Sequence, residues 1–346
     1  MRLTAKYIRL IILLLGLIII PSLQYIFAQD IHLSQFYTSP LNLNPASTGF
    51  YSGTHRFGIN CKNQWNSITT PYQTMAVSAE LHILKRKFHR DILGGGIQIN
   101  HDKAGDSEYG TFQSLFSFSY IKSLNKKNNH FISIGIQTGA SQRKINYNAL
   151  KFDNQFDGDA YNPALSHGED FKKDNLWYFD FSSGLHWHLQ LNNEQSYEAG
   201  ASLFHINSPN QSFLGYDNIL LDKKLILYGN AYLQFWDKTD LYPAFLYMNQ
   251  GKYREFVFGS RVAFIKDRHP INYTATDFGL FIRHKDAVIV VLGIDYKSYT
   301  LGLSYDINIS KLKTASNSRG GFEISVTYRL NKSDKIIPRE VPCPIF

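Results

Sequence analysis

The sequence lacks three features that would each indicate a particular class of protein. No cysteine stands directly after the N-terminal apolar run, which argues against a lipid-anchored lipoprotein. Beyond that run no stretch approaches ~18 consecutive apolar residues, so no transmembrane helix is predicted. A G-x-S-x-G motif is also missing, and an esterase needs a serine within hydrogen-bond reach of a base. We therefore expect neither a helical membrane protein nor an enzyme.

A strong excess of one charge is missing as well. The formal net charge is +8, and removing Arg2, Lys6 and Arg9 with the N-terminal segment described next takes three from +8 and leaves +5. The remaining basic residues are scattered along the chain, whereas a nucleic-acid-binding protein gathers them on one face. We therefore expect no nucleic-acid partner.

The first residues have the layout of a secretory signal peptide. Residues 1–9 are basic and contain no acid, residues 10–20 are all apolar except for Gly16, and residues 21–28 are small and mixed. We predict cleavage after Ala28, although Ile26 stands where a small residue is preferred. An uncleaved anchor helix is the alternative, but its apolar run is shorter than the ~20 residues that a membrane span needs.

Apolar and polar side chains alternate along the last two hydrophobic runs, residues 299–309 and 320–330. The apolar members are Leu301, Leu303, Tyr305, Ile307 and Ile309 in the first run and Phe322, Ile324, Val326, Tyr328 and Leu330 in the second. A period of two is typical of a β-strand with one apolar face. The chain also contains 25 Phe and 22 Tyr, and transmembrane β-barrels place aromatic girdles at both membrane interfaces. Many such strands behind an export signal indicate a barrel that is apolar outside and polar inside.

The pattern predicts an all-β fold, a transmembrane antiparallel β-barrel of about 14 strands. The predicted strands are 54–63, 72–84, 91–101, 111–123, 130–145, 176–190, 196–206, 223–235, 240–248, 253–265, 275–284, 286–297, 299–309 and 320–330. An even number lets both termini lie in the periplasm. Residues 29–53 are predicted to form an N-terminal extension at the periplasmic mouth or in the lumen, and residues 331–346 a Pro-rich periplasmic tail.

Loop lengths support the same topology. The long gaps, 64–71, 102–110, 146–175, 207–222 and 310–319, all follow odd-numbered strands, and those after even-numbered strands are mostly short, with 266–274 the exception. Outer-membrane barrels have long extracellular loops and short periplasmic turns. This order separates Cys61, near the outer end of the first strand, from Cys343 in the tail. The ~25 Å apolar band between them is too wide for a disulfide, so we predict two unpaired thiols.

Six blocks, taken in chain order, resemble the PorP/SprF family of Bacteroidota outer-membrane proteins. They are Gln29-Asp30 through Ser34-Gln35-Phe36-Tyr37 to Asn44-Pro45-Ala46 and Gly49; Asn63-Gln64-Trp65 with Tyr72-Gln73-Thr74; Gly94-Gly95-Gly96; Asp102-Lys103-Ala104-Gly105; Leu150-Lys151-Phe152-Asp153-Asn154-Gln155; and Pro342-Cys343-Pro344-Ile345-Phe346. Ile345 stands where the family more often has a basic residue. The resemblance covers essentially the whole mature chain.

The resemblance implies a component of the type IX secretion system and gliding machinery. Its members serve the secretion apparatus or help a particular secreted adhesin to reach or stay on the cell surface, and the second role is the one we favour. The resemblance implies outer-membrane lipid, the C-terminal domain of the secreted substrate and periplasmic secretion subunits as partners. The alternative function is a pore that conducts solutes. No cofactor is implied.

Candidate partner or plug residues come from these blocks and from the long loop 146–175. They are Asn44, Pro45, Gln64, Trp65, Asp102, Gly105, Phe152, Gln155, Phe156, Cys343 and Phe346. Pro45 fixes a turn in which Asn44 can bond to neighbouring backbone, and this block either plugs the barrel or forms part of a surface for a partner. The loop exceeds the ~12–15 residues of a simple connection, so it either folds inward as a lid or binds an adhesin outside.

Two segments contain residue types that can bind a metal ion, but neither is predicted to be a metal site. Residues 153–159 have the oxygen-ligand spacing and glycine of a calcium loop, but Ala164 replaces the bidentate glutamate and no helices flank it. We expect a solvated acidic loop there. His186 and His188 share the inward face of one strand, as metal ligands could, but barrel lumens are generally polar in any case.

Overall fold

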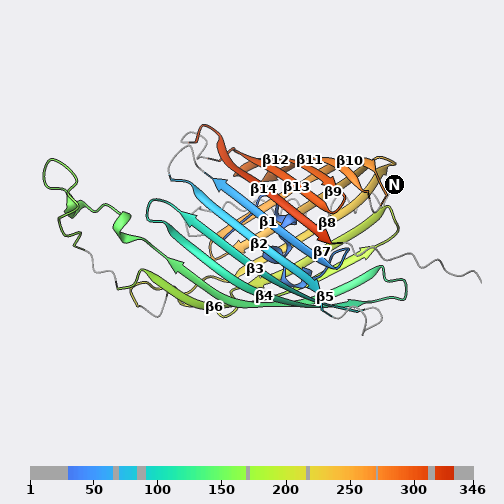
Figure 1. Ribbon diagram of the computed structural model, residues 1–346, viewed down its shortest axis with the longest axis horizontal. Helices are drawn as coiled ribbons and strands as arrows, with labels where there is room; N and C mark the ends of the chain where they lie inside the picture. Colours follow the sequence, from blue (N-terminus) through green and yellow to red (C-terminus); the bar gives the residue numbers. More distant parts are fainter. Residues whose placement is uncertain are drawn as a thin grey trace, which may run out of the picture.

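A closed barrel of fourteen antiparallel strands makes up the fold, in which each strand pairs with its neighbours in sequence and β14 closes on β1 (Figure 1). The computed structural model describes residues 30–64, 70–83, 91–168, 172–215, 219–269, 272–310 and 316–330. The strands are β1 (His55–Gln64), β2 (Tyr72–His82), β3 (Ile92–Ala104), β4 (Tyr109–Ser123), β5 (His130–Lys144), β6 (Asn175–Gln190), β7 (Gln195–Phe204), β8 (Lys224–Trp236), β9 (Thr239–Gln250), β10 (Tyr253–Asp267), β11 (Thr274–Arg283), β12 (Ala287–Tyr296), β13 (Tyr299–Asn308) and β14 (Arg319–Leu330). All fourteen predicted strands are present, with no end displaced by more than three residues.

Alternation along each strand separates an outer apolar face from an inner face. On β13, Leu301 and Leu303 are exposed on the outside, whereas Ser304 and Asp306 are buried inside. On β6, Phe179 and Phe181 face outward and Asp180 inward. Rows of exposed Leu, Ile and Phe around a closed sheet match a protein whose outer solvent is lipid. The predicted fold is thus confirmed.

The longest connections gather at one end of the barrel, the end where odd-numbered strands lead to even-numbered ones, called here the long-loop end. They join β5 to β6 and β7 to β8. The predicted gap 102–110 is wrong, because β3 and β4 stay paired up to Ala104 and Tyr109 and leave only residues 105–108 as a turn. The other end, where β1 begins and β14 ends, is called the turn end.

The N-terminal residues 30–53, called here the luminal segment, lie inside the barrel. This segment contains the short helices η1 (Phe36–Thr38), α2 (Pro40–Leu43) and η2 (Pro45–Ser47). Prolines at the first positions of α2 and η2 suit a helix start because that N–H needs no partner there. Among the described residues, no helix has the length and apolar character to cross a membrane.

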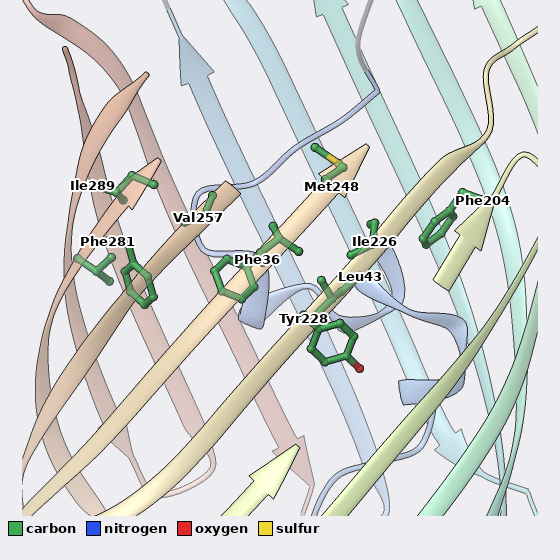
Figure 2. Close-up of a cluster of buried hydrophobic side chains, with 11 residues drawn as sticks. Phe36, Leu43, Phe204, Ile226, Tyr228, Met248, Val257, Phe281 and Ile289 are labelled. Atoms are coloured by element: carbon green, nitrogen blue, oxygen red, sulfur yellow. The ribbon is translucent and has the colours of Figure 1, made fainter. Parts of the chain in front are cut away.

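An apolar core also lies inside the barrel, which corrects the expectation of a polar interior. Figure 2 shows Phe36 and Leu43 of the luminal segment pointing toward the wall residues Ile226, Phe281 and Ile289. The remaining members of this cluster are Phe204, Tyr228, Leu246, Met248, Val257 and Val291. The cluster exists because strands β8–β12 carry apolar residues at several inward positions as well as on their outer face. The luminal segment covers that inner face and shields it from water.

Candidate functional site

The block Asn44-Pro45-Ala46 forms a compact turn in the middle of the lumen. The side chain of Asn44 accepts a hydrogen bond of 2.8 Å from the backbone N–H of Ala46, as the sequence predicts. Its amide donates to the carbonyl oxygen of Leu185 on β6 at 2.7 Å. Asn44 is completely buried, so both bonds are protected from water. The turn is therefore joined to the wall and not only enclosed by it.

Glycines on the inner wall make room for the luminal segment. A Cβ atom on Gly184 would lie 1.9 Å from Oδ1 of Asn44, and one on Gly135 would lie 2.4 Å from the backbone nitrogen of Ala46. A Cβ on Gly94 would lie 2.4 Å from the carbonyl oxygen of Thr48. Only a residue without a side chain permits backbone or ligand to come so close. The wall of β3, β5 and β6 is thus shaped to hold residues 44–48.

The opposite wall binds Ser34 and Gln35 through polar side chains. Glu323 on β14 accepts hydrogen bonds from the backbone N–H groups of Ser34 at 2.7 Å and of Gln35 at 3.2 Å. Ser325 donates to the side-chain oxygen of Gln35 at 2.8 Å, and a Cβ on Gly302 would lie 2.2 Å from that same oxygen. The luminal segment therefore bridges the lumen from β13 and β14 to β5 and β6.

A buried network of ion pairs surrounds this second contact. Nη1 of Arg283 lies 3.1 Å from a carboxylate oxygen of Asp306, and Nζ of Lys62 lies 3.6 Å from the same atom. Nη2 of Arg283 also donates to Oγ of Ser34 at 2.9 Å. The side chains of Arg283, Lys62 and Asp306 are at most 4% exposed. Buried charges need such pairing because an isolated one is very costly in a low-dielectric interior.

Asp30, the first described residue, is held by charges near the long-loop end. Its carboxylate contacts His205, which follows β7, and lies 3.2 Å from Nζ of Lys224 at the start of β8. Nδ1 of His205 lies 2.8 Å from Asp180. Burial alone would lower the pKa of His205, but the carboxylates of Asp30 and Asp180 raise it to about 9. Burial alone would raise the pKa of Asp30, but His205 and Lys224 hold it well below its ordinary value.

The luminal segment then runs to the turn end. The N–H of Gly49 donates to Glu80 at 3.0 Å, and Nε2 of His82 lies 2.7 Å from the carbonyl oxygen of Gly49. Both partners lie near the end of β2, close to where β1 begins. The segment is therefore fixed at both ends and at two places between them.

His186 and His188 belong to this packing. Nδ1 of His186 lies 2.8 Å from the hydroxyl oxygen of Tyr228, which lies 2.9 Å from Oγ of Ser47. His188 lies 3.2 Å from Glu198, and the ring of Phe50 packs against both histidines. Groups of three or more His, Cys, Asp or Glu arranged to hold a metal ion do not occur among the described residues.

The other candidate residues do not join Asn44 and Pro45. Gln64 ends β1 at the long-loop end, paired with Tyr72 and Gly321. Asp102 lies within β3 and accepts a 2.5 Å hydrogen bond from Thr74, and Gly105 occupies the β3–β4 turn with a φ of 69°. Trp65, Cys343 and Phe346 lie outside the described residues. The predicted separation of Cys343 from Cys61 therefore stays a prediction. Cys61 itself is an exposed free thiol.

The described residues of the long loop between β5 and β6, 145–168 and 172–174, extend beyond the barrel end, shown in green in Figure 1, and do not enter the lumen. Within it Gln155 is buried and accepts a 3.2 Å hydrogen bond from the N–H of Phe152, whereas Phe156 is 59% exposed. Asp157, in the segment that has the residue spacing of a calcium loop, accepts hydrogen bonds from the N–H groups of Ala160 and Asp159. These bonds lower the pKa of Asp157 because they stabilise its charged form.

Several residues of the site escaped sequence analysis. Tyr228, Arg283 and Glu323 carry central contacts, yet each occupies an ordinary inward position of a strand. The inward glycines, among them Gly94 and Gly184, were a usable signal, since they alternate in register with the buried face. The double-sided apolar run of β12 was a signal for the interior core.

Comparisons with known proteins agree with this architecture. A solved structure of the "TodX deltaS2S3 mutant monoaromatic hydrocarbon channel" is 10% identical, with a TM-score of 0.50 over 85% of this chain and 94% of that one. The toluene transporter TbuX of Ralstonia pickettii is 11% identical, with a TM-score of 0.48 over 85% of this chain and 94% of that one. A search of curated proteins finds no match.

The family comparison is more specific than the structural ones. The model described as "Type IX secretion system membrane protein PorP/SprF" matches residues 26–328, which is most of the chain. Together with the closed fourteen-stranded barrel, this match indicates an outer-membrane protein. The chain therefore belongs to the PorP/SprF family of type IX secretion system membrane proteins.

Proposed function

We propose that this barrel is a non-catalytic scaffold of the type IX secretion system that docks or retains a secreted adhesin-type substrate at the cell surface. The observation that carries the proposal is the luminal segment, which is hydrogen-bonded to opposite walls and seated against four glycines. A solute channel needs a passage lined by water, whereas this interior is occupied by packed apolar residues and paired charges. The outside of the barrel is then the part available for a partner.

The long-loop end is the surface that we assign to the substrate. In outer-membrane barrels the long loops face outward and the short turns face the periplasm. The β5–β6 loop lies at this end and presents the exposed side chains of Phe156, Tyr161 and Leu165. Exposed aromatic and aliphatic residues on a folded loop favour protein binding. The turn end, which includes the end of β14, is then the periplasmic face, available to other secretion subunits.

A binding measurement tests this proposal. The purified barrel in detergent is mixed with the C-terminal domain of a type IX secreted adhesin from the same organism, and the dissociation constant is measured. The proposal predicts saturable binding, and Phe156→Ala is expected to weaken it about three- to thirtyfold, as for a typical buried interface aromatic. Heat-modifiable electrophoretic mobility serves as the control that the variant barrel is folded. Absence of binding by the wild-type barrel contradicts the proposal.

A further inference from the structure

Strand β6 extends well past its neighbour β7 at the long-loop end. Its pairing with β5 runs along the whole strand, from Asn175 opposite Lys144 to Leu189 opposite His130. Its pairing with β7 covers only Ser183 to Gln190. Within the part of the chain that the structure describes, residues 175–182 of β6 therefore have a strand partner on one side only. We call this the free edge of β6.

Asn207 caps the lower part of the free edge. The N–H of Phe181 donates to Oδ1 of Asn207 at 3.1 Å, and Nδ2 of Asn207 donates to the carbonyl oxygen of Phe179 at 2.7 Å. The N–H of Ile206 donates to the carbonyl oxygen of Phe181 at 2.8 Å. The side-chain amide of Asn207 thus takes the place of a strand's peptide group.

Above this cap the backbone groups of the edge have no backbone partner among the residues that the structure describes. In an antiparallel ladder the N–H and C=O of alternate residues point to the same edge. The backbone N–H and C=O of Phe181 point to the β7 side, where they bond to Asn207 and Ile206. The N–H of Phe179 and both backbone groups of Trp177 therefore point to that side too. Rows of unpaired backbone groups of this kind are templates for pairing with another strand, and folded proteins usually cover or blunt them.

Two aromatic side chains flank the free groups. Phe179 is 75% exposed and Trp177 is 57% exposed. Trp177 lies opposite Gln142, and Asn175 opposite Lys144, on the outward face of β5. Lys144 and Asn175 are both polar and lie one outward position beyond Gln142 and Trp177, so the apolar band ends at Trp177. Trp177 and the edge from there to Asn175 face water at the rim, whereas Phe179 lies one outward position deeper, opposite Ala140. An aromatic residue next to an open strand edge in water favours a protein partner.

The charged residues around the edge indicate which side chains a partner strand would carry. Lys144, Lys172 and Lys173 are exposed beside the start of β6, with Asp174 as the acidic residue among them. An extended segment with acidic side chains complements the three lysines, while its alternate apolar side chains cover Trp177 and Phe179. Recognition by strand addition combines backbone hydrogen bonds for affinity with such alternate side chains for specificity.

We propose that the free edge of β6 receives an extended, acidic strand of the secreted substrate, which pairs with Trp177 and Phe179 by β-augmentation. This inference rests on the proposed function and names the surface that performs it. The barrel wall then continues from β6 into the substrate above Asn207. The bound strand supplies the backbone partners that β7 is too short to give.

Amide hydrogen exchange of the barrel, alone and with the substrate domain named above, tests the inference. Exchange in the peptide spanning residues 175–181 is expected to slow only when the substrate domain is bound. Two variants then separate the contribution of the backbone N–H of residue 177 to binding from that of its side chain. Trp177→Thr keeps the free N–H, whereas Trp177→Pro removes it without touching the β5 pairing, because that N–H points away from β5. We expect the proline variant to bind about tenfold more weakly than the threonine variant.

The outcomes distinguish this inference from the function on which it rests. Binding of the substrate domain with unchanged exchange at residues 175–181 overturns the inference and leaves the docking function standing. Absence of any binding overturns both. Protection that grows with the concentration of barrel alone shows that a second copy covers the edge, which also overturns the inference. If Trp177→Pro loses its heat-modifiable mobility, the exchange result on the wild-type barrel decides.

Discussion

At the scale of single residues, inward glycines decide how closely the luminal segment approaches the wall. Gly184 and Gly135 face residues 44–46, and Gly302 faces Gln35. Alternation predicts that these positions point inward, and it also predicts the outward rows of Leu, Ile and Phe. It does not say what lies opposite each glycine, because that partner is separated by about one hundred residues or more in sequence. The contact could be found only once the chain was folded.

Enlarging one of these glycines is expected to expel the turn at Asn44. The variant Gly184→Val places atoms where Oδ1 of Asn44 lies, and overpacking of this kind typically costs about 1–3 kcal/mol. We expect a lower temperature for the loss of heat-modifiable mobility. Ala140→Val, on the outward face of β5, is the matched control because its added methyl groups face lipid. Equal transition temperatures for the two variants would show that the turn is not seated against Gly184.

At the scale of elements, the strand positions were predictable, whereas the sequence left a plugged barrel as one of two alternatives and did not predict its apolar core. A period of two located all fourteen strands because each has one lipid-facing side. The apolar inner face of β12 broke that rule, since Ile289 and Val291 are buried against the luminal segment. Pro40 and Pro45 argue against a strand in residues 30–53, because proline lacks the N–H that a strand ladder needs. The short helices that replace it follow from packing against the wall, which no local pattern encodes.

The luminal segment is attached to the wall through the ion pairs of Asp30 with His205 and Lys224, so the strength of this attachment depends on pH. The pKa of His205 is raised from 6.5 to about 9, so its stabilising contribution is complete below about pH 6.5 and is lost as the pH rises through 9. The pKa of Asp30 is lowered from its ordinary 3.8, so its contribution is present above that value and lost in more acidic solution. Attachment should therefore be strongest between about pH 4 and 6.5.

Amide exchange near residues 30–35, corrected for intrinsic rates, measures this attachment. We expect opening of the segment to become easier between pH 6.5 and 9 in the wild-type barrel. His205→Gln removes the titrating group, so the variant should open more readily at pH 6 and show little further change up to pH 9. The same pH response in both proteins would rule out His205 as its source.

At the scale of the whole molecule, three different surroundings act on one closed sheet. Lipid accounts for the outer apolar rows, the luminal segment accounts for the inner core and glycines, and water at the rim accounts for the exposed loop and the free edge of β6. Closure of β14 on β1 removes the sheet edges that an open sheet would expose to lipid. The fold and the family could thus be predicted from the sequence, whereas the choice between a luminal plug and a segment at the barrel mouth required the structure.

The central claim is that this barrel is a filled scaffold and not a channel. Bilayer conductance of the purified wild-type barrel tests it most directly, with a variant lacking residues 30–47 as the comparison for an emptied lumen. We predict that the wild-type barrel is electrically silent and that the shortened variant conducts. A stable, reproducible open-channel current from the wild-type barrel would contradict the account.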